Sequence, residues 1–187
     1  MSPKYITLSL FAVLALAQLF IPASMIWKQQ ETITGGQAFK FRTAPIDPSD
    51  PFRGKYITLS FDIARYEAAD SGYFHRGENI YAFLEEDSLG YAQIRELSKT
   101  PPENNIPYVQ AEVRYSYKEN VTLNFPFTRY YMEESKAYEA ELAYRRAQRE
   151  VETETYALVM VKDGNSALED VILDGVSIRE VVEAVAD

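Results

Sequence analysis

Three aspartates are the residues of this sequence best suited to chemistry. Asp47 and Asp50 lie in a segment with three prolines, residues 44–54, and Asp62 follows it closely. Converging carboxylates could act as the general acid and base of a hydrolase, or bind Ca²⁺ or Mg²⁺ through their oxygen atoms. The segment lacks the fixed alternation and the glycine of a calcium-binding loop, and aspartates in such segments commonly cap turns. We therefore predict no metal site, and a carboxylate-dependent hydrolase stays an alternative.

Beyond these aspartates, the sequence offers few catalytic groups. It contains no cysteine and one histidine, His75, which excludes disulfides, thiolate metal sites and multi-histidine metal sites. His75 lies in a loop bounded by glycines, and its spacing suggests no serine–histidine–aspartate triad. A signal-peptidase-like protease is also disfavoured, because no lysine is marked as a base for Ser49. We predict no catalytic residue and no cofactor, and we expect a binding protein more than an enzyme.

The proline-rich segment itself is the candidate binding site. Its prolines fix the backbone angle φ, and Gly54 permits a close backbone approach just before the next strand. The segment can be a rigid connection that sets the register of that strand. It can also be a recognition loop whose stiffness reduces the entropy lost on binding. The second interpretation predicts a binding site made of Asp47, Asp50, Arg53, Gly54 and Tyr56.

Tyrosines and arginines around two neighbouring strands form a second candidate surface. Tyrosine supplies rigid contact area with a polar tip and is common at recognition surfaces, sugar sites included. It is also a good strand former at half-buried positions. We favour the role in the sheet and keep a cell-wall glycan-binding module as an alternative. The residues concerned are Tyr108, Tyr115, Tyr117, Tyr130, Tyr131, Arg114 and Arg129.

An uncharged N-terminal segment, residues 5–27, precedes all of these groups. As a helix it spans the ~30 Å hydrocarbon core of a bilayer. Tyr5 and Trp27 stand at its two ends, where amphipathic rings favour the headgroup region. Lys4 and the free amino group are the positive charges on the short side, which favours an N-terminus inside the cell and an exported remainder.

This segment divides the chain into three parts. We predict a transmembrane anchor at 1–27, a polar stalk at 28–36 that ends in a turn or flexible joint at Gly35-Gly36, and an exported domain at 37–187. The alternative is a signal peptide cleaved after Ala17, which would leave apolar residues at the new N-terminus.

The residue patterns of the exported part predict an α+β domain with a mostly antiparallel sheet and two helices. Apolar and polar residues alternate in seven or eight strands. Apolar residues spaced three and four apart predict one helix from Ala137 to Val151, and Ser177 to Glu180 form a capping box before a second. The predicted strands are 37–43, 56–64, 79–86, 90–97, 108–117, 121–127, 155–162 and 166–173.

The charge balance excludes one class of partner. The 187 residues include 19 Lys and Arg and 28 Asp and Glu, for a formal net charge of −9. A nucleic-acid binder needs a basic face that displaces counterions from phosphates. We therefore predict no nucleic-acid partner, and contact with the membrane through the N-terminal helix.

The proline-rich segment and the strand after it resemble the GDYXXLXY family, which is named for a Gly-Asp-Tyr-x-x-Leu-x-Tyr signature. Gly54, Tyr56 and Leu59 match the signature, while Lys55 and Phe61 replace its Asp and its last Tyr. The preceding Pro-x-Asp-Pro-x-Asp pattern and the apolar helix agree as well. The resemblance implies a bacterial membrane-anchored protein of unknown biochemical role, often encoded beside multi-spanning membrane proteins, and it supplies no catalytic residues.

Taken together, these observations predict an inner-membrane protein with one N-terminal span and a periplasmic or otherwise extracytoplasmic domain. Its expected role is a non-catalytic binding module of the cell envelope. The expected partner is a multi-spanning membrane protein, and the expected contact surface includes residues 44–55.

Overall fold

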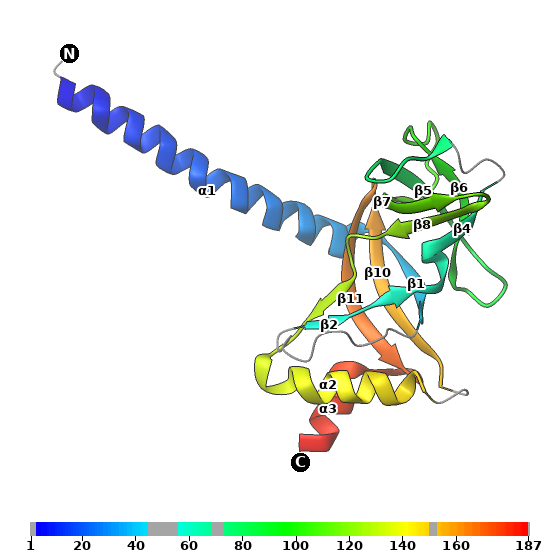
Figure 1. Cartoon of the computed structure of the whole chain (residues 1–187). Helices are drawn as coiled ribbons and strands as arrows, with labels where there is room; N and C mark the ends of the chain where they lie inside the picture. The colour runs from blue at the N-terminus through cyan, green and yellow to red at the C-terminus, as the bar shows by residue number, and fades with distance from the viewer. Residues whose placement is uncertain (1–2, 45–55, 69–72, 150–152, 187) are drawn as a thin grey trace.

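The computed structural model describes residues 3–44, 56–68, 73–149 and 153–186. One long helix, α1 (Pro3–Gly35), projects from a domain built mainly of strands (Figure 1). Two further helices, α2 (Glu134–Ala147) and α3 (Ile178–Ala186), lie together at one end of that domain. The named strand pairs are all antiparallel. The structure therefore confirms the predicted α+β class with one N-terminal helix.

Two five-stranded sheets and one strand pair form the body of the domain. The first sheet has the order β12-β11-β10-β1-β3, the second has the order β4-β8-β7-β5-β6, and β2 pairs with β9. The first sheet consists of β1 (Gln37–Ala44), β3 (Ser60–Phe61), β10 (Thr155–Lys162), β11 (Asn165–Leu173) and β12 (Val176–Ser177). The second consists of β4 (Arg65–Glu67), β5 (Asn79–Glu86), β6 (Ala92–Ser98), β7 (Tyr108–Tyr117) and β8 (Asn120–Asn124). The separate strand pair consists of β2 (Tyr56–Thr58) and β9 (Arg129–Tyr131).

The stretch 56–64, predicted as one strand, is instead divided among three elements. Strand β2 pairs with β9, β3 pairs with β1, and a short 3₁₀ helix, η1 (Asp62–Ala64), follows. Between the two strands, the Leu59 amide donates to the carbonyl of Thr128. The chain crosses here from one sheet to another, so the alternation of side chains continues while the pairing partner changes.

A cluster of phenylalanines joins the two sheets. Phe41 of β1 is fully buried, and its ring lies 4.8 Å from that of Phe127 and 5.7 Å from that of Phe61, measured between ring centres. Phe125, which directly follows β8, lies 6.1 Å from the Phe41 ring. Such edge-to-face pairs contribute about 0.5–1.5 kcal/mol each beyond the area they bury. The cluster thus fixes the position of the β8–β9 connection against the first sheet.

Helix α1 continues through the predicted stalk and its last turn is packed against the domain. Thr32 is buried, and Glu31 forms an ion pair with Lys162 of β10 at 2.6 Å. The Gly36 amide donates to the Thr32 carbonyl at 3.0 Å. A side chain at Gly36 would meet the Thr32 carbonyl oxygen at 2.4 Å and the Val161 oxygen at 3.1 Å. We call this contact of Glu31, Thr32, Gly36, Val161 and Lys162 the helix–domain joint.

The turn predicted at Gly35-Gly36 lies at Gly36, where the chain bends between α1 and β1, while Gly35 still belongs to the helix. Glycine is needed at position 36 for a close approach between the backbone of the helix and that of β10. Residues 28–35 are polar although they are not a separate stalk, since they still form part of the helix. They end the apolar part of α1 and begin its contact with the domain.

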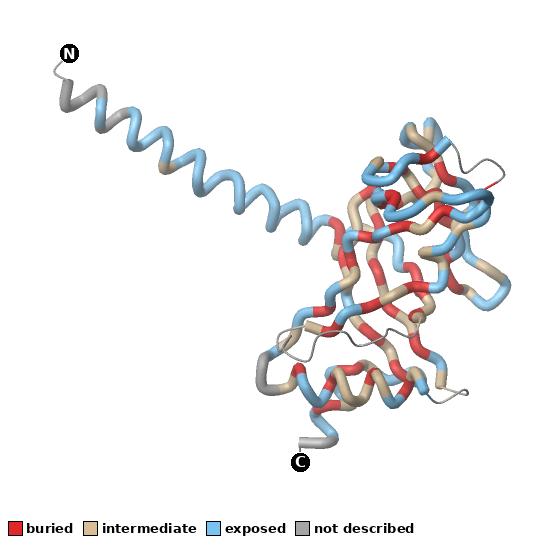
Figure 2. Tube along the Cα trace, in the orientation of Figure 1, coloured by how far each residue is buried: buried red, intermediate tan, exposed pale blue. Residues whose placement is uncertain are grey.

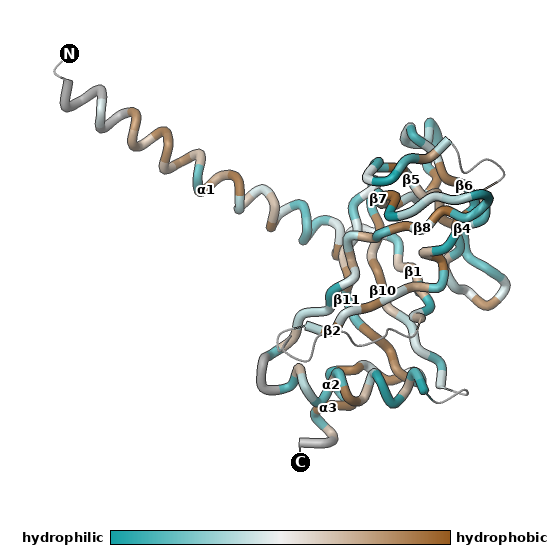
Figure 3. Tube along the Cα trace, viewed as in Figure 1, coloured by the Kyte–Doolittle hydropathy of each residue, from teal (hydrophilic) through white to brown (hydrophobic). Residues whose placement is uncertain are grey.

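The rest of α1 is exposed wherever its burial is described, apart from the half-exposed Ala15 (Figure 2). Its exposed residues include many large apolar ones between Leu10 and Trp27, and Figure 3 colours much of this stretch as hydrophobic. Residues Leu10–Gly35 make a helix long and apolar enough to cross a membrane, near the N-terminus. By length and composition it could be a membrane anchor or a signal sequence.

The joint gives a first prediction. Gly36→Ala should lower the stability of the chain by about 1–3 kcal/mol, because the new methyl group meets backbone atoms that cannot turn away. For a domain of this size, each kcal/mol corresponds to about 2–4 °C in thermal unfolding temperature. Thermal unfolding of the full chain in detergent micelles measures the effect.

Gly35→Ala is the matched control. A side chain at Gly35 would first meet the flexible end of Lys162 at 3.4 Å. Its unfolding temperature should stay close to that of the wild type. Equal effects of the two substitutions would show that Gly36 is not a close contact.

Candidate functional site

Most of the predicted binding residues fall outside the described part of the chain. Asp47, Asp50, Arg53 and Gly54 lie within 45–55, which the structure does not describe. Tyr56 is described, as the first residue of β2. It is paired with Tyr131 of β9. The site can therefore be built only from the residues on the C-terminal side of the proline-rich segment.

Tyr56 belongs to a small exposed surface that we call the Tyr56 face, made of Tyr56, Arg129 and Tyr131. The two tyrosine rings lie 5.4 Å apart between centres, and the Arg129 guanidinium lies 5.1 Å from the centre of the Tyr56 ring. A hydrogen bond with Tyr131 raises the pKa of the Arg129 guanidinium. The Tyr131 side chain is 62% exposed. The face thus offers two rings and a cation for contact with a partner.

The residue between the two outward side chains of β9 points inward and holds the strand. Tyr130 is buried, and its hydroxyl donates to an Asp170 carboxylate oxygen at 2.9 Å. It accepts a hydrogen bond from Nε of Arg179 at 2.6 Å. Asp170 also accepts from the Val171 amide. Burial, and next the charge of Asp170, raise the pKa of Tyr130 to about 12. This network joins β9 to β11 and α3 beneath the Tyr56 face.

The other predicted tyrosines have mixed roles. Tyr108 packs beneath the turn at Gly164 and beside Tyr81, with 5.7 Å between the ring centres. Tyr115 and Tyr117 of β7 are exposed and stacked, with 6.3 Å between their ring centres. The buried Tyr130 and the half-buried Tyr108 agree with the predicted role in the sheet, while Tyr115, Tyr117 and Tyr131 remain on the surface.

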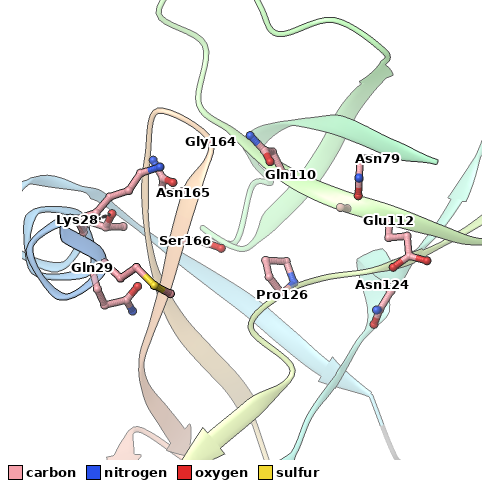
Figure 4. A pocket seen from close by; sticks show the side chains of 13 residues that line it. Lys28, Gln29, Asn79, Gln110, Glu112, Asn124, Pro126, Gly164, Asn165 and Ser166 are labelled. Carbon is pink, nitrogen blue, oxygen red and sulfur yellow. Dashed lines mark hydrogen bonds between the residues drawn. The ribbon is translucent and has the colours of Figure 1, made fainter. Parts of the chain in front are cut away.

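A cavity of about 580 Å³ lies where α1 meets the domain, and we call it the junction cavity. Helix α1 forms one side with residues that include Lys28 and Gln29, and strands of the second sheet form the opposite side with Glu112 and Asn124 (Figure 4). Five carboxamide side chains line it: Gln29, Asn79, Gln110, Asn124 and Asn165.

The β10–β11 hairpin closes one end of the junction cavity. Its turn, Asp163-Gly164, has positive φ at both residues, as a tight two-residue hairpin requires. The Gln110 amide donates to the Gly164 carbonyl at 3.4 Å, which draws the turn against β7. Asn165 and Ser166 are thereby placed in the same wall as Gln110. Sequence reasoning missed this cavity, because its residues come from elements far apart in the chain.

A second cavity, of about 830 Å³, lies between the β2–η1 segment and β8. Asp62 lies in its wall together with Arg65 and Arg114. Desolvation raises the pKa of Asp62, and the charge of Arg42 opposes this. The hydrolase hypothesis needs a second carboxylate here, and its candidates Asp47 and Asp50 lie outside the described residues. It therefore stays a prediction. Among the described residues, no group of three His, Cys, Asp or Glu could hold a metal ion.

Comparison with known families gives one match. A family model described as GDYXXLXY protein matches residues 18–171, which include the second half of α1, the helix–domain joint and the strands up to β11. No curated protein and no solved structure matches the chain. The match extends over the residues of the Tyr56 face and over the lining of the junction cavity.

The Tyr130 network gives the second prediction. Tyr130→Phe removes a hydroxyl that bonds to Asp170 and Arg179, and should cost about 1–3 kcal/mol of unfolding free energy at neutral pH. The folded pKa of Tyr130, about 12, exceeds the usual unfolded value of about 10. The folded state therefore keeps its proton between these values, and wild-type stability falls as pH rises through this window. The difference in unfolding free energy between the wild type and Tyr130→Phe should therefore become smaller from pH 10 to 12.

Denaturant midpoints measured from pH 7 to 12 test both parts. Tyr131→Phe is the control, because this neighbouring hydroxyl is on the exposed face, and its effect should stay within about 0.5 kcal/mol. Equal midpoints for Tyr130→Phe and the wild type at neutral pH would contradict the role given to the network.

Proposed function

The chain belongs to the GDYXXLXY family, and we propose that it is a single-pass membrane protein whose domain binds another membrane protein. The helix–domain joint carries this proposal. It makes α1 a part of the folded domain and holds that domain in one orientation on its anchor. The proposed location is the bacterial inner membrane, with the domain on the periplasmic or extracytoplasmic side, as the charges around the apolar segment predict.

The exposed surface of α1 supports an anchor over a cleaved signal peptide. Cleavage after Ala17 would leave half of the apolar helix attached to the domain. Leu19, Phe20 and Trp27 would remain in water, with exposed fractions of 69%, 73% and 77%. Moving each such side chain from water into an apolar environment gains about 1.5–3 kcal/mol. A lipid bilayer supplies that environment for the whole segment.

The Tyr56 face supports a role in binding. Tyrosine and arginine are enriched among the residues that contribute most to protein interfaces. Tyr130 locks β9 from beneath, so presenting Arg129 and Tyr131 costs little ordering entropy on binding. The face lies next in sequence to residues 45–55, which hold the other predicted binding residues. The proposed partner is a multi-spanning membrane protein, as the family resemblance implies.

Site-specific cross-linking tests the proposal. A photoreactive phenylalanine analogue replaces Tyr131 in the full chain, in intact cells of the native host. Illumination should give one discrete adduct, which mass spectrometry identifies as a multi-spanning membrane protein. Adding Arg129→Ala should reduce its yield several-fold, since the cation contributes to the contact.

Tyr115 supplies the matched control. It is similarly exposed, at 54%, but lies on β7 outside the Tyr56 face. The analogue at this position should give no such adduct. The same adducts at both positions, adducts with cell-wall glycan only, or no adduct at position 131 would contradict the proposed partner. A mature chain that begins near Gln18 would contradict the anchor.

A further inference from the structure

We propose that the junction cavity binds the headgroup of a phospholipid that carries both a phosphate and a primary ammonium, as phosphatidylethanolamine does. The inference rests on the membrane anchoring in the proposed function, and is independent of the protein partner. Four observations carry it: the height of the cavity on α1, its charges, its free carboxamides and its rigid walls.

The cavity lies at the level of the lipid headgroups. Its residues on α1 extend from Met25, in the apolar span, to Thr32, in the helix–domain joint. At 1.5 Å per residue this interval covers about 10 Å along the helix. Trp27 and Lys28, which mark the end of the apolar span, lie within this interval of the helix. The headgroup layer on one side of a bilayer is about 5–7 Å thick, so a headgroup beside α1 reaches the cavity without leaving its leaflet.

The charges of the cavity match a headgroup with two opposite charges. Lys28 is the one cationic and Glu112 the one anionic side chain among its described lining residues. They stand on opposite sides, on α1 and on β7 (Figure 4). Neither forms an ion pair with another described residue. Lysine binds phosphate as a point charge, and a carboxylate accepts from an ammonium. One side of the cavity thus suits the phosphate and the other the amine.

Carboxamides supply the remaining hydrogen bonds. The side chains of Gln29, Asn79, Gln110 and Asn124 form no hydrogen bond with other described residues. Each carries both a donor NH₂ and an acceptor oxygen. The NH₂ groups can donate to phosphate oxygens, while the carbonyl oxygens can accept from the N–H bonds of a primary ammonium. A quaternary ammonium has no N–H bond to donate, so the site should distinguish ethanolamine from choline.

The walls of the cavity are preformed, because contacts within the protein fix their positions. The helix–domain joint fixes α1 against β10, and the contact of Gly164 with Gln110 fixes the hairpin against β7. Met25, Ala111 and Pro126 add aliphatic surface that suits the glycerol and first acyl carbons of a lipid. A preformed site loses little entropy on binding.

Lipid binding to the full chain tests the inference. The protein is reconstituted in nanodiscs of phosphatidylcholine with a fixed minor fraction of either phosphatidylethanolamine or phosphatidylglycerol, and the co-purified lipids are counted after detergent extraction by native mass spectrometry. The wild type should retain phosphatidylethanolamine about tenfold over phosphatidylcholine. Phosphatidylglycerol, which lacks the amine, should show no such enrichment. Soluble glycerophosphoethanolamine, the same headgroup without acyl chains, should compete only at millimolar concentration.

Two variants separate the charges. Glu112→Gln should bring the preference for phosphatidylethanolamine over phosphatidylcholine close to one, while Lys28→Gln should weaken retention of all three lipids several-fold. Glu119→Gln, an exposed carboxylate on the turn before β8, is the control and should behave as the wild type.

The outcomes distinguish this inference from the proposed function. Equal retention of phosphatidylethanolamine and phosphatidylcholine by the wild type would overturn it, as would an unchanged preference in Glu112→Gln. Competition by glycerophosphoethanolamine at the concentrations at which the lipid binds would show a site for the free headgroup, and would overturn the lipid assignment. A chain that incorporates into nanodiscs but shows no preference contradicts this inference alone. A chain that fails to incorporate contradicts the anchor as well.

Discussion

The close packing of the last turn of α1 on strand β10 is the constraint on which the rest of this structure depends. At Gly36 the backbone of the helix and that of the strand approach until no side chain fits between them. The ion pair of Glu31 with Lys162 adds little energy of its own, because exposed pairs contribute up to about 1 kcal/mol. An apolar helix and a polar domain thereby become one body.

Two further sets of contacts hold the surface features in fixed positions relative to this joint. The phenylalanine cluster around Phe41 holds the two sheets together, so the opposite walls of the junction cavity keep their spacing. The hydrogen bonds of Tyr130 with Asp170 and Arg179 hold β9 from within, so the Tyr56 face keeps its shape. Both surfaces are thus rigid relative to α1. Such rigidity is what the proposed contacts with a lipid and with a membrane protein require.

The sequence predicts those parts of the fold that local patterns encode. The ranges 79–86, 108–117 and 155–162 coincide with β5, β7 and β10. Buried residues alternate along β10 and most of β7, which is the pattern that predicts a strand. In β5 the alternation is interrupted, because Ala82, Phe83 and Leu84 are all buried. The strand predicted at 56–64 is divided, because alternation reports burial and not the identity of the pairing strand.

Long-range contacts explain what the sequence could not predict. The close packing at Gly36 involves Thr32, four residues earlier, and also Val161, more than a hundred residues away. The junction cavity collects carboxamides from α1, three strands and a hairpin, and no local pattern joins them. Of the predicted site, Tyr56 lies on a described face, and Asp47, Asp50, Arg53 and Gly54 lie outside the described residues.

The most direct test of a single rigid unit is a distance measurement between helix and domain. The chain contains no cysteine, so Gln18→Cys on α1 and Glu96→Cys on β6 allow two spin labels to be attached without background. Pulsed electron paramagnetic resonance on the full chain in nanodiscs should give one narrow distance distribution. A broad distribution, or several separate distances, would show that the domain turns freely on its anchor and would contradict the account.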